Sequence, residues 1–285
     1  MTTTFRAACV IGWPVEHSRS PLIHNYWLKR YGIVGEYRRE LVPPEEFAAF
    51  IRTLGARGYV GANVTLPHKE AALALSKSDE RARAVGAANT LWIGDGVLRS
   101  TNTDVEGFLN NLDASAPHWD RDLGKAVVLG AGGAARAVIY GLLTRGVQQI
   151  ILVNRTPGRA ELLRQKFGPR VQVARWGELD ATLADAALLA NTTTLGMPGQ
   201  PDLAIDFARL PVHAIVADLV YVPVETPLLA QAKSRDLRTA DGLGMLLHQA
   251  VRGFELWFGT KPEVTAELRA LIEGDLGGAV RKVSG

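Results

Sequence analysis

The sequence predicts an α/β protein of two domains, each built on an open sheet. The chain has 285 residues, which is long for a single hydrophobic core. Short apolar runs typical of buried strands alternate with segments whose apolar residues recur at helical spacing. A hydrophobic share of 47% and a charged share of 21% are those of an ordinary globular protein. We therefore expect two packed α/β domains.

Charge and residue types exclude several classes of function. The formal net charge is +3, and the scattered Lys and Arg favour small anionic ligands over nucleic acid. Cys9 is the single cysteine, which excludes an intramolecular disulfide, and its apolar neighbours predict a buried strand position. The histidines have no metal-ligand spacing, so no metal site is expected. No segment is long enough to span a membrane or act as a signal peptide, which predicts a cytoplasmic protein.

The first third of the chain predicts strands and helices in alternation. Prolines mark the starts of three helices, and Gly94-Asp95-Gly96 is a hairpin turn signal. The expected strands cover residues 5–11, 35–42 and 59–65 and the two arms of a hairpin, 87–92 and 97–100; the expected helices begin at Pro21, Pro44 and Pro67.

Polar residues follow these strands, at the edge where open α/β sheets bind ligands. Ser18 and Ser20 precede a helix and form a candidate carboxylate cradle, although Ser20 also suits a helix N-cap. Asn63 and Thr65 end the third strand. Lys69 stands in the first turn of the next helix, where a positive charge is locally unfavourable. Such a departure from a local rule indicates a functional lysine, and a surface lysine is the equal alternative.

The segment after the hairpin leads into the second domain. Asp104 opens a helix that carries Phe108 and Leu112, so it is either a cap or a site residue. Residues 113–124 contain Pro117 and several polar side chains. This composition predicts a linker.

Residues 126–137 predict a buried strand, a tight glycine turn and the start of a helix. Gly130, Gly132 and Ala135 occupy the three small positions of a G-x-G-x-x-G/A fingerprint. The helix N-terminus offers free N–H groups to a pyrophosphate. A second buried strand at 149–153 completes a βαβ unit of about 30 residues. The motif therefore predicts a dinucleotide site.

The end of that second strand indicates which dinucleotide binds. An NAD-binding protein places an acidic residue there for the ribose 2′-hydroxyl, whereas this chain has Asn154-Arg155-Thr156. A guanidinium suits a 2′-phosphate, so we expect NADP. Arg159 adds charge one turn later, and the alternative for both arginines is a solvated helix start.

The rest of the chain continues the α/β pattern. Further strands are expected near 171–173, 187–190 and 214–217, and the third of these runs into Asp218 to Tyr221. Residues 191–197 form a polar loop where a cofactor ribose would lie. A long helix begins at Asp241-Gly242, and Gly242, Met245 and Gln249 share one of its faces.

Eight short motifs, in one order over nearly the whole chain, resemble those of the shikimate dehydrogenase family. Val222 and Leu195 depart from the family pattern, at positions to which we assign no chemistry. The motifs are Ser18-x-Ser20, Asn63-Val64-Thr65-x-Pro67-x-Lys69, Gly86-Ala87-Ala88-Asn89-Thr90, Asn102-Thr103-Asp104, Gly130-Ala131-Gly132-Gly133-Ala134, Asn154-Arg155-Thr156, Tyr221-x-Pro223-x-x-Thr226-Pro227-Leu228-Leu229 and Asp241-Gly242-x-x-Met245-x-x-x-Gln249.

The resemblance implies a reversible NADPH-dependent reduction of 3-dehydroshikimate to shikimate in aromatic amino-acid biosynthesis. It implies a discontinuous substrate-binding domain, residues 1–104 plus 241–285, and a Rossmann-like doubly wound NADP-binding domain, residues 105–240, with a cleft between them. We expect a monomer or homodimer without nucleic-acid or membrane partners. A quinate or aminoshikimate dehydrogenase is an alternative, and so is an inactive NADP-binding sensor, although Lys69 and Asp104 argue against a sensor.

The resemblance also implies roles for individual residues. Reduction of a ring ketone creates alkoxide character, which needs a proton donor within hydrogen-bond reach. Lys69 is implied as that acid/base and Asp104 as its catalytic partner. The implied substrate contacts are Ser18, Ser20, Asn63, Thr65, Asn89, Asp104, Tyr221 and Gln249. The implied cofactor contacts are Gly130, Ala131, Gly132, Gly133, Ala134, Asn154, Arg155, Thr156, Arg159, Leu219, Gly242 and Glu80.

Overall fold

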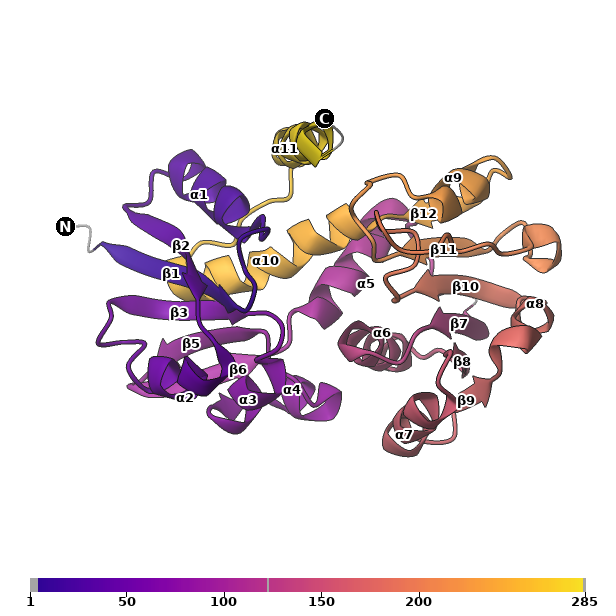
Figure 1. Ribbon diagram of the computed structural model, residues 1–285, viewed down its shortest axis with the longest axis horizontal. Coiled ribbons are helices and arrows are strands. Elements are labelled where there is room, and N and C mark those ends of the chain that lie inside the picture. The colour runs from indigo at the N-terminus through magenta and orange to yellow at the C-terminus, as the bar shows by residue number, and fades with distance from the viewer. Residues whose placement is uncertain (1–4, 122, 284–285) are drawn as a thin grey trace. The chain divides into compact units, whose positions relative to one another are not determined.

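In the computed structural model the chain forms two compact units, which are coloured along the sequence in Figure 1. The structure describes residues 5–121 and 123–283, so the outer ends of the predicted substrate domain, residues 1 and 285, lie outside this range. Unit 1 combines the chain up to Thr103 with the chain from Gln249 onward, and unit 2 is Asp104–His248. The chain thus leaves unit 1 once and returns to it within the long helix α10 (Gly242–Phe258).

Unit 1 contains a mixed six-stranded sheet in the order β2-β1-β3-β5-β6-β4. The first three strands pair in parallel, whereas β5 and β6 form an antiparallel hairpin. The strands are β1 (Arg6–Gly12), β2 (Gly35–Leu41), β3 (Tyr59–Val64), β4 (Lys77–Ser78), β5 (Thr90–Gly94) and β6 (Val97–Thr101). The helices other than α10 are α1 (Ser20–Arg30), α2 (Pro44–Arg52), α3 (Lys69–Ala74), α4 (Glu80–Val85) and α11 (Ala266–Val283).

Local sequence explains the hairpin and the core of this unit. Asp95 and Gly96 both have positive φ, 52° and 73°, as expected for the two central residues of a tight hairpin turn. Cys9 is fully buried in β1 among apolar neighbours, so its predicted strand position is confirmed. Burial raises the pKa of the Cys9 thiol well above its ordinary value.

Unit 2 contains an all-parallel six-stranded sheet in the order β12-β11-β10-β7-β8-β9. The strand order reverses on either side of β7, which is the doubly wound arrangement of dinucleotide-binding domains. The strands are β7 (Lys125–Leu129), β8 (Gln149–Val153), β9 (Val171–Ala174), β10 (Ala186–Asn191), β11 (Ile215–Asp218) and β12 (Arg238–Ala240). The helices other than α10 are α5 (Asp104–Ser115), α6 (Gly133–Thr144), α7 (Pro157–Phe167), α8 (Leu179–Thr182) and α9 (Pro227–Lys233), with 3-10 turns at Trp176–Glu178 and Phe207–Arg209.

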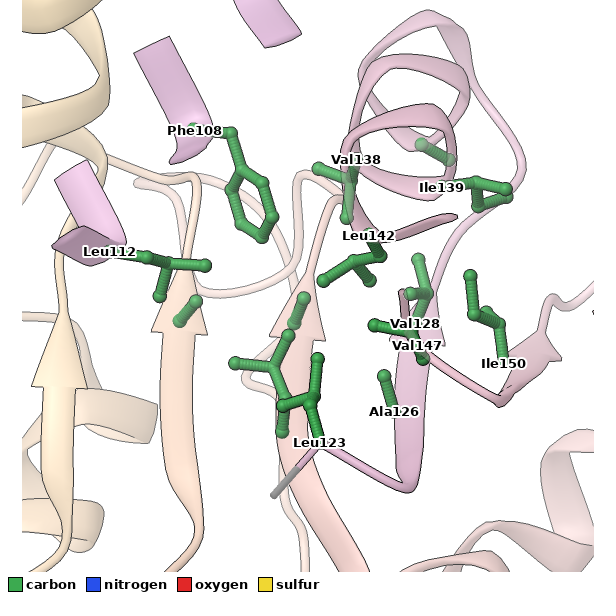
Figure 2. Close-up of a cluster of buried hydrophobic side chains, with 14 of the residues drawn as sticks. Phe108, Leu112, Leu123, Ala126, Val128, Val138, Ile139, Leu142, Val147 and Ile150 are labelled. Carbon is green, nitrogen blue, oxygen red and sulfur yellow. The ribbon is translucent and has the colours of Figure 1, made fainter. Parts of the chain in front are cut away.

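Two helices pack on one face of the unit 2 sheet. Figure 2 shows Phe108 and Leu112 of α5 and Leu142 of α6 in the same buried cluster as Val128 of β7. Each fully buried apolar side chain of this kind contributes about 1.5–3 kcal/mol. The cluster fixes the start of α6 on β7, which is where the glycine fingerprint lies.

The predicted linker at residues 113–124 is wrong in its described part, because these residues are packed into unit 2. Residues up to Ser115 complete α5, and Trp119 is buried in the same apolar cluster, with its indole N–H donating to Asp113 at 2.7 Å. Arg145 pairs with Asp120 at 2.6 Å and also with Asp113. Proline and polar residues indicated a loop, but the composition did not reveal that Trp119 anchors it.

The structure also bears on membrane insertion and metals. Over the described ranges, no helix combines the length and the apolar character that crossing a membrane requires. The same residues contain no cluster of three or more His, Cys, Asp or Glu side chains with the geometry of a metal site.

Candidate active site

The Ser18 loop leads directly into helix α1. Ser20 is the first helical residue and is buried, while Arg19 holds the N-cap position without a side-chain cap, so the interpretation of Ser20 as an N-cap is wrong. The Ser18 Oγ accepts a hydrogen bond from the Ser20 N–H at 3.3 Å. The Arg39 guanidinium of β2 donates to the Ser18 carbonyl at 2.7 Å. The two serines are therefore held together at the positive end of an 11-residue helix.

The end of β3 carries Asn63, which is buried and hydrogen-bonded at both ends of its amide. Its Oδ1 accepts from the Tyr37 hydroxyl at 2.6 Å. Its Nδ2 donates to the Asn89 carbonyl at 3.2 Å and to the Thr90 hydroxyl at 3.1 Å. Thr65 follows β3 and is half-buried. Both predicted residues thus lie at the carboxyl end of a central strand, where the sheet of an α/β domain binds ligands.

Lys69 begins helix α3, two positions after the predicted start at Pro67. Pro67 belongs instead to a turn closed by the His68 N–H and the Thr65 carbonyl at 3.0 Å, and the Leu66–Pro67 peptide is cis. His68 is buried, with its ring stacked on Phe47 at 4.3 Å. The Lys69 carbonyl accepts from the Ala88 N–H at 2.9 Å. Lys69 is half-buried, and hydrogen bonds at the His68 N–H and at its own carbonyl fix the main chain around it.

Asn89 connects the hairpin to the start of α5. Its Oδ1 accepts from the Thr103 N–H at 2.7 Å and from the Thr103 hydroxyl at 3.2 Å. The Thr103 hydroxyl is also within hydrogen-bond reach of Gln249 Oε1, at 3.4 Å, and of the Thr90 hydroxyl, at 3.0 Å. Asn63, Asn89 and Gln249 therefore belong to one continuous hydrogen-bond network within unit 1.

The remaining predicted substrate residues belong to unit 2. Asp104 is the first residue of α5 and is half-buried, directly after Thr103 in the chain. Tyr221 is half-buried in the loop that follows β11.

That loop is organised by Asp218, a buried residue that the sequence motifs did not single out. Its carboxylate accepts from the Asn191 amide at 2.9 Å, the Val220 N–H at 3.1 Å and the Thr226 hydroxyl at 2.7 Å. Burial raises the pKa of Asp218, and these donors counteract the rise. The ends of β10 and β11 and the start of α9 are thereby joined at one carboxylate.

The glycine fingerprint folds as the sequence predicts. Gly130 ends β7 with φ +99°, and a Cβ there would lie 2.8 Å from the Thr192 hydroxyl oxygen. Gly132 is the N-cap of α6, and both it and Gly133 face open space, with no atom within 4 Å of a Cβ added at either position. Ala135 is fully buried. The first N–H groups of this 12-residue helix are thus open to an anionic ligand. Ala131 and Ala134 flank the turn and are half-buried.

The turn after β8 presents cationic side chains. Arg155, Thr156 and Arg159 are exposed at the start of α7, and the Asn154 amide donates to the Thr156 carbonyl at 2.8 Å. Within the described part of the chain, neither guanidinium is paired with a carboxylate. The turn therefore offers two positive charges and a hydroxyl, with no acidic residue beside them.

Three further cofactor predictions lie in different places. Gly242 begins α10, and a Cβ there would lie 2.4 Å from the Leu219 carbonyl oxygen, so only glycine permits this approach. The Leu219 N–H donates to the Asn191 carbonyl at 3.0 Å. Glu80 is exposed at the start of α4, in unit 1, and the structure does not group it with the residues of the glycine turn.

Family models match most of the chain. The substrate binding domain of shikimate dehydrogenase matches residues 10–91, shikimate / quinate 5-dehydrogenase matches residues 117–196, and the shikimate 5'-dehydrogenase C-terminal domain matches residues 242–272. A shikimate dehydrogenase (NADP(+)) of Rhodopseudomonas palustris (strain TIE-1) is 66% identical over 97% of this chain and 99% of that protein. The chain belongs to the shikimate dehydrogenase family.

Solved structures of the shikimate dehydrogenase family share the fold. The enzyme from Thermus thermophilus, in complex with NADP(H) and shikimate, is 34% identical with a TM-score of 0.83, covering 96% of this chain and 99% of that one. Quinate dehydrogenase from Corynebacterium glutamicum, in complex with NAD, is 31% identical with a TM-score of 0.87, covering 95% and 100%. The predicted fold class and the prediction of NADP are confirmed.

The residues of unit 2 fit NADP. The open space at Gly132 and Gly133 leaves room for a pyrophosphate at the start of α6. The exposed guanidinium of Arg155 stands where an NAD-binding Rossmann domain places a ribose-binding acid. The open glycine turn and the exposed arginine are both features of this chain's own structure.

The sequence motifs missed Tyr37, Thr90 and Thr103 as supports of the site. Tyr37 lies in a strand between charged neighbours, so the only signal was an aromatic residue at an inward-facing strand position. Thr90 and Thr103 stood within quoted motifs, but a threonine in a strand, such as Thr90, is ordinarily explained by strand propensity, and Thr103 directly precedes a helix.

Proposed function

We propose that this enzyme catalyses the reversible NADPH-dependent reduction of 3-dehydroshikimate to shikimate in aromatic amino-acid biosynthesis. The observation that carries the proposal is the network of unit 1, which joins three of the predicted substrate residues by hydrogen bonds next to Lys69. Membership of the shikimate dehydrogenase family supports it.

The substrate carboxylate is bound at the start of α1 in this proposal. The Ser18 and Ser20 hydroxyls donate to it, and the helix dipole favours the negative charge. The ring hydroxyls pair with the polar side chains of the network and its neighbours. These are Asn63, Thr65, Asn89 and Gln249 in unit 1 and Asp104 and Tyr221 in unit 2.

NADPH, when bound, supplies the hydride for the ring ketone. The N–H groups at Gly132, Gly133 and Ala134 hold its pyrophosphate. Arg155 and Thr156 bind the 2′-phosphate, and Arg159 adds positive charge. Asn154, Leu219 and Gly242 shape the remainder of the cofactor site. Glu80, in unit 1, is the remaining predicted cofactor contact.

Lys69 and Asp104 handle the proton. As the ketone oxygen gains negative charge, the Lys69 ammonium donates a proton to it and becomes a neutral amine. The Asp104 carboxylate accepts a hydrogen bond from the adjacent ring hydroxyl and orients the lysine. In the reverse direction the lysine amine removes the proton from the hydroxyl on the carbon that loses the hydride.

The test begins with absorbance at the nicotinamide band, using shikimate and NADP⁺ with the unmodified enzyme. Lys69→Ala is expected to lower kcat roughly 10²- to 10⁴-fold, with a much smaller change in substrate binding. Asp104→Asn is expected to lower kcat as well, and the double variant to lose far less than the product of the two losses. Lys77→Ala serves as the matched control, because Lys77 is an exposed lysine in β4 of the same unit.

Near-normal kcat in Lys69→Ala would show that the proton comes from elsewhere, with Tyr221 the next candidate. Single losses that simply multiply in the double variant would show that the two residues do not act as a pair.

A second candidate activity is oxidation of quinate, favoured by the structural similarity to a quinate dehydrogenase. The Ser18-x-Ser20 pair argues for shikimate, because relatives acting on quinate often have threonine at the second position. The ratio of kcat/KM for shikimate to kcat/KM for quinate decides between the two activities. A monomer or homodimer in the cytoplasm stays a prediction.

A further inference from the structure

We propose that Tyr37 is a positioning residue of the substrate site: its hydroxyl donates to Asn63 Oδ1 and fixes the Asn63 amide in its binding orientation. The inference rests on the proposed substrate role of Asn63. It adds a residue that no motif indicated.

The orientation of the Asn63 amide follows from its neighbours. The Asn89 main-chain carbonyl, 3.2 Å from Nδ2, has no proton to give, so the amide nitrogen must face it. The opposite end, Oδ1, then needs a donor, and the Tyr37 hydroxyl supplies it at 2.6 Å. Rotating the amide would turn its oxygen toward a carbonyl oxygen. Tyr37 and Asn89 thus allow only one orientation of the Asn63 side-chain amide.

Burial raises the pKa of Tyr37 well above its ordinary value, so the phenol keeps its proton and remains a donor to Asn63. The Tyr37 hydroxyl of β2 therefore supports the amide at the end of β3.

Tyr37 is itself held in place by helix α1. The Asn25 side chain brackets its main chain, accepting from the Tyr37 N–H at 2.9 Å and donating to its carbonyl at 3.0 Å. The His24 ring stacks on the Tyr37 ring with centroids 4.2 Å apart. Because β2 is an edge strand, Asn25 supplies the pairing that a neighbouring strand would otherwise provide. The helix that begins at Ser20 therefore also positions the phenol.

Removal of the hydroxyl leaves Asn63 Oδ1 buried without its donor, so that only the two donations from Nδ2 still hold the amide. Tyr37→Phe is expected to raise KM for shikimate about tenfold, which corresponds to about 1.4 kcal/mol. The KM for NADP⁺ is expected to stay within about twofold, because the change removes only a substrate-side hydrogen bond. The matched control is Tyr59→Phe, since Tyr59 is also a buried tyrosine of the sheet but its hydroxyl donates to Glu40.

A double-variant cycle with Asn63→Ala separates positioning from general structural damage. If Tyr37 acts through Asn63, Tyr37→Phe changes shikimate KM much less in the Asn63→Ala background than alone. An equal effect in both backgrounds overturns the inference, and so does an unchanged KM in Tyr37→Phe when Asn63→Ala raises it. An unchanged KM in Asn63→Ala overturns the proposed role of Asn63 instead, which separates the two failures.

A milder variant covers the case in which Tyr37→Phe does not fold. Asn25→Ala removes the bracket and leaves the phenol, so it is expected to raise shikimate KM in the same pattern by a smaller factor. Folded Asn25→Ala with the shikimate KM of the unmodified enzyme would overturn the inference.

Discussion

The places of individual candidate site residues in the fold were predictable from sequence where these residues stand at a strand end or near a helix start. Ser18, Asn63 and Lys69 occupy such positions, and each breaks or exploits a local rule of charge or polarity. Tyr37 and Thr103 were not predictable, because their role lies in hydrogen bonds to residues far away in the sequence. The sequence shows groups aimed at a ligand more readily than groups aimed at one another.

His24 provides a pH test of the buried layer behind the site. Its ring is fully buried against Tyr37, Trp27 and Trp257, and burial lowers its pKa to about 3, against a small opposing contribution from Asn63. Because the folded-state pKa lies below the unfolded value of 6.5, unfolding takes up a proton as pH falls through the window from 6.5 to 3. Stability is therefore lost toward acid.

The expected loss attributable to His24 is about 2 kcal/mol in the free energy of unfolding between pH 7.5 and pH 5. Urea unfolding of the unmodified protein and of His24→Gln measures it as the difference between the two pH profiles. The exposed His17, replaced in His17→Gln, is the control and is expected to leave the profile unchanged. Parallel profiles for His24→Gln and the unmodified protein would contradict the assigned shift.

Single elements of the fold were predictable where the backbone conformation at a position permits few residue types. The glycine turn after β7 and the hairpin turn at Asp95 and Gly96 both require positive φ, and both fold as expected. Pro67 misled the prediction of α3, because a proline suits a turn as well as a first helical position. The prediction of a linker at 113–124 failed in the described part of this segment, because burial of Trp119 holds it within unit 2 despite the polar residues around it.

The turn between β8 and α7 carries the cofactor prediction at this scale. Arg155→Ala is expected to raise KM for NADP⁺ about ten- to hundredfold, the range for losing hydrogen bonds to a charged group, and to leave KM for NAD⁺ nearly unchanged. Arg164→Ala is the matched control, because Arg164 lies on the same helix and pairs with Glu161 at 2.5 Å. Equal losses with both cofactors would show that Arg155 does not distinguish the 2′-phosphate.

For the whole molecule, length and alternating periodicity were sufficient to predict two α/β units. The division of the chain required more, because the second break, between His248 and Gln249, lies inside α10 rather than at its start. Apolar residues recur at helical spacing on both sides of that break, so no change in pattern marks it. A discontinuous unit was inferred only through resemblance to a family.

The proposed sites of the serine pair in unit 1 and of Arg155 in unit 2 predict separable effects on stability. At a concentration 100 times its Kd, either ligand stabilises the protein by about 2.7 kcal/mol. Ser18→Ala is expected to weaken shikimate binding about tenfold, which reduces the stabilisation by shikimate to about half, while that by NADP⁺ is retained. Arg155→Ala is expected to do the reverse, so each variant is the other's control. Thermal unfolding with each ligand alone measures both. If Ser18→Ala diminished both stabilisations equally, the serine would support the fold as a whole rather than one ligand, because a local contact changes only the equilibrium of the ligand that it touches.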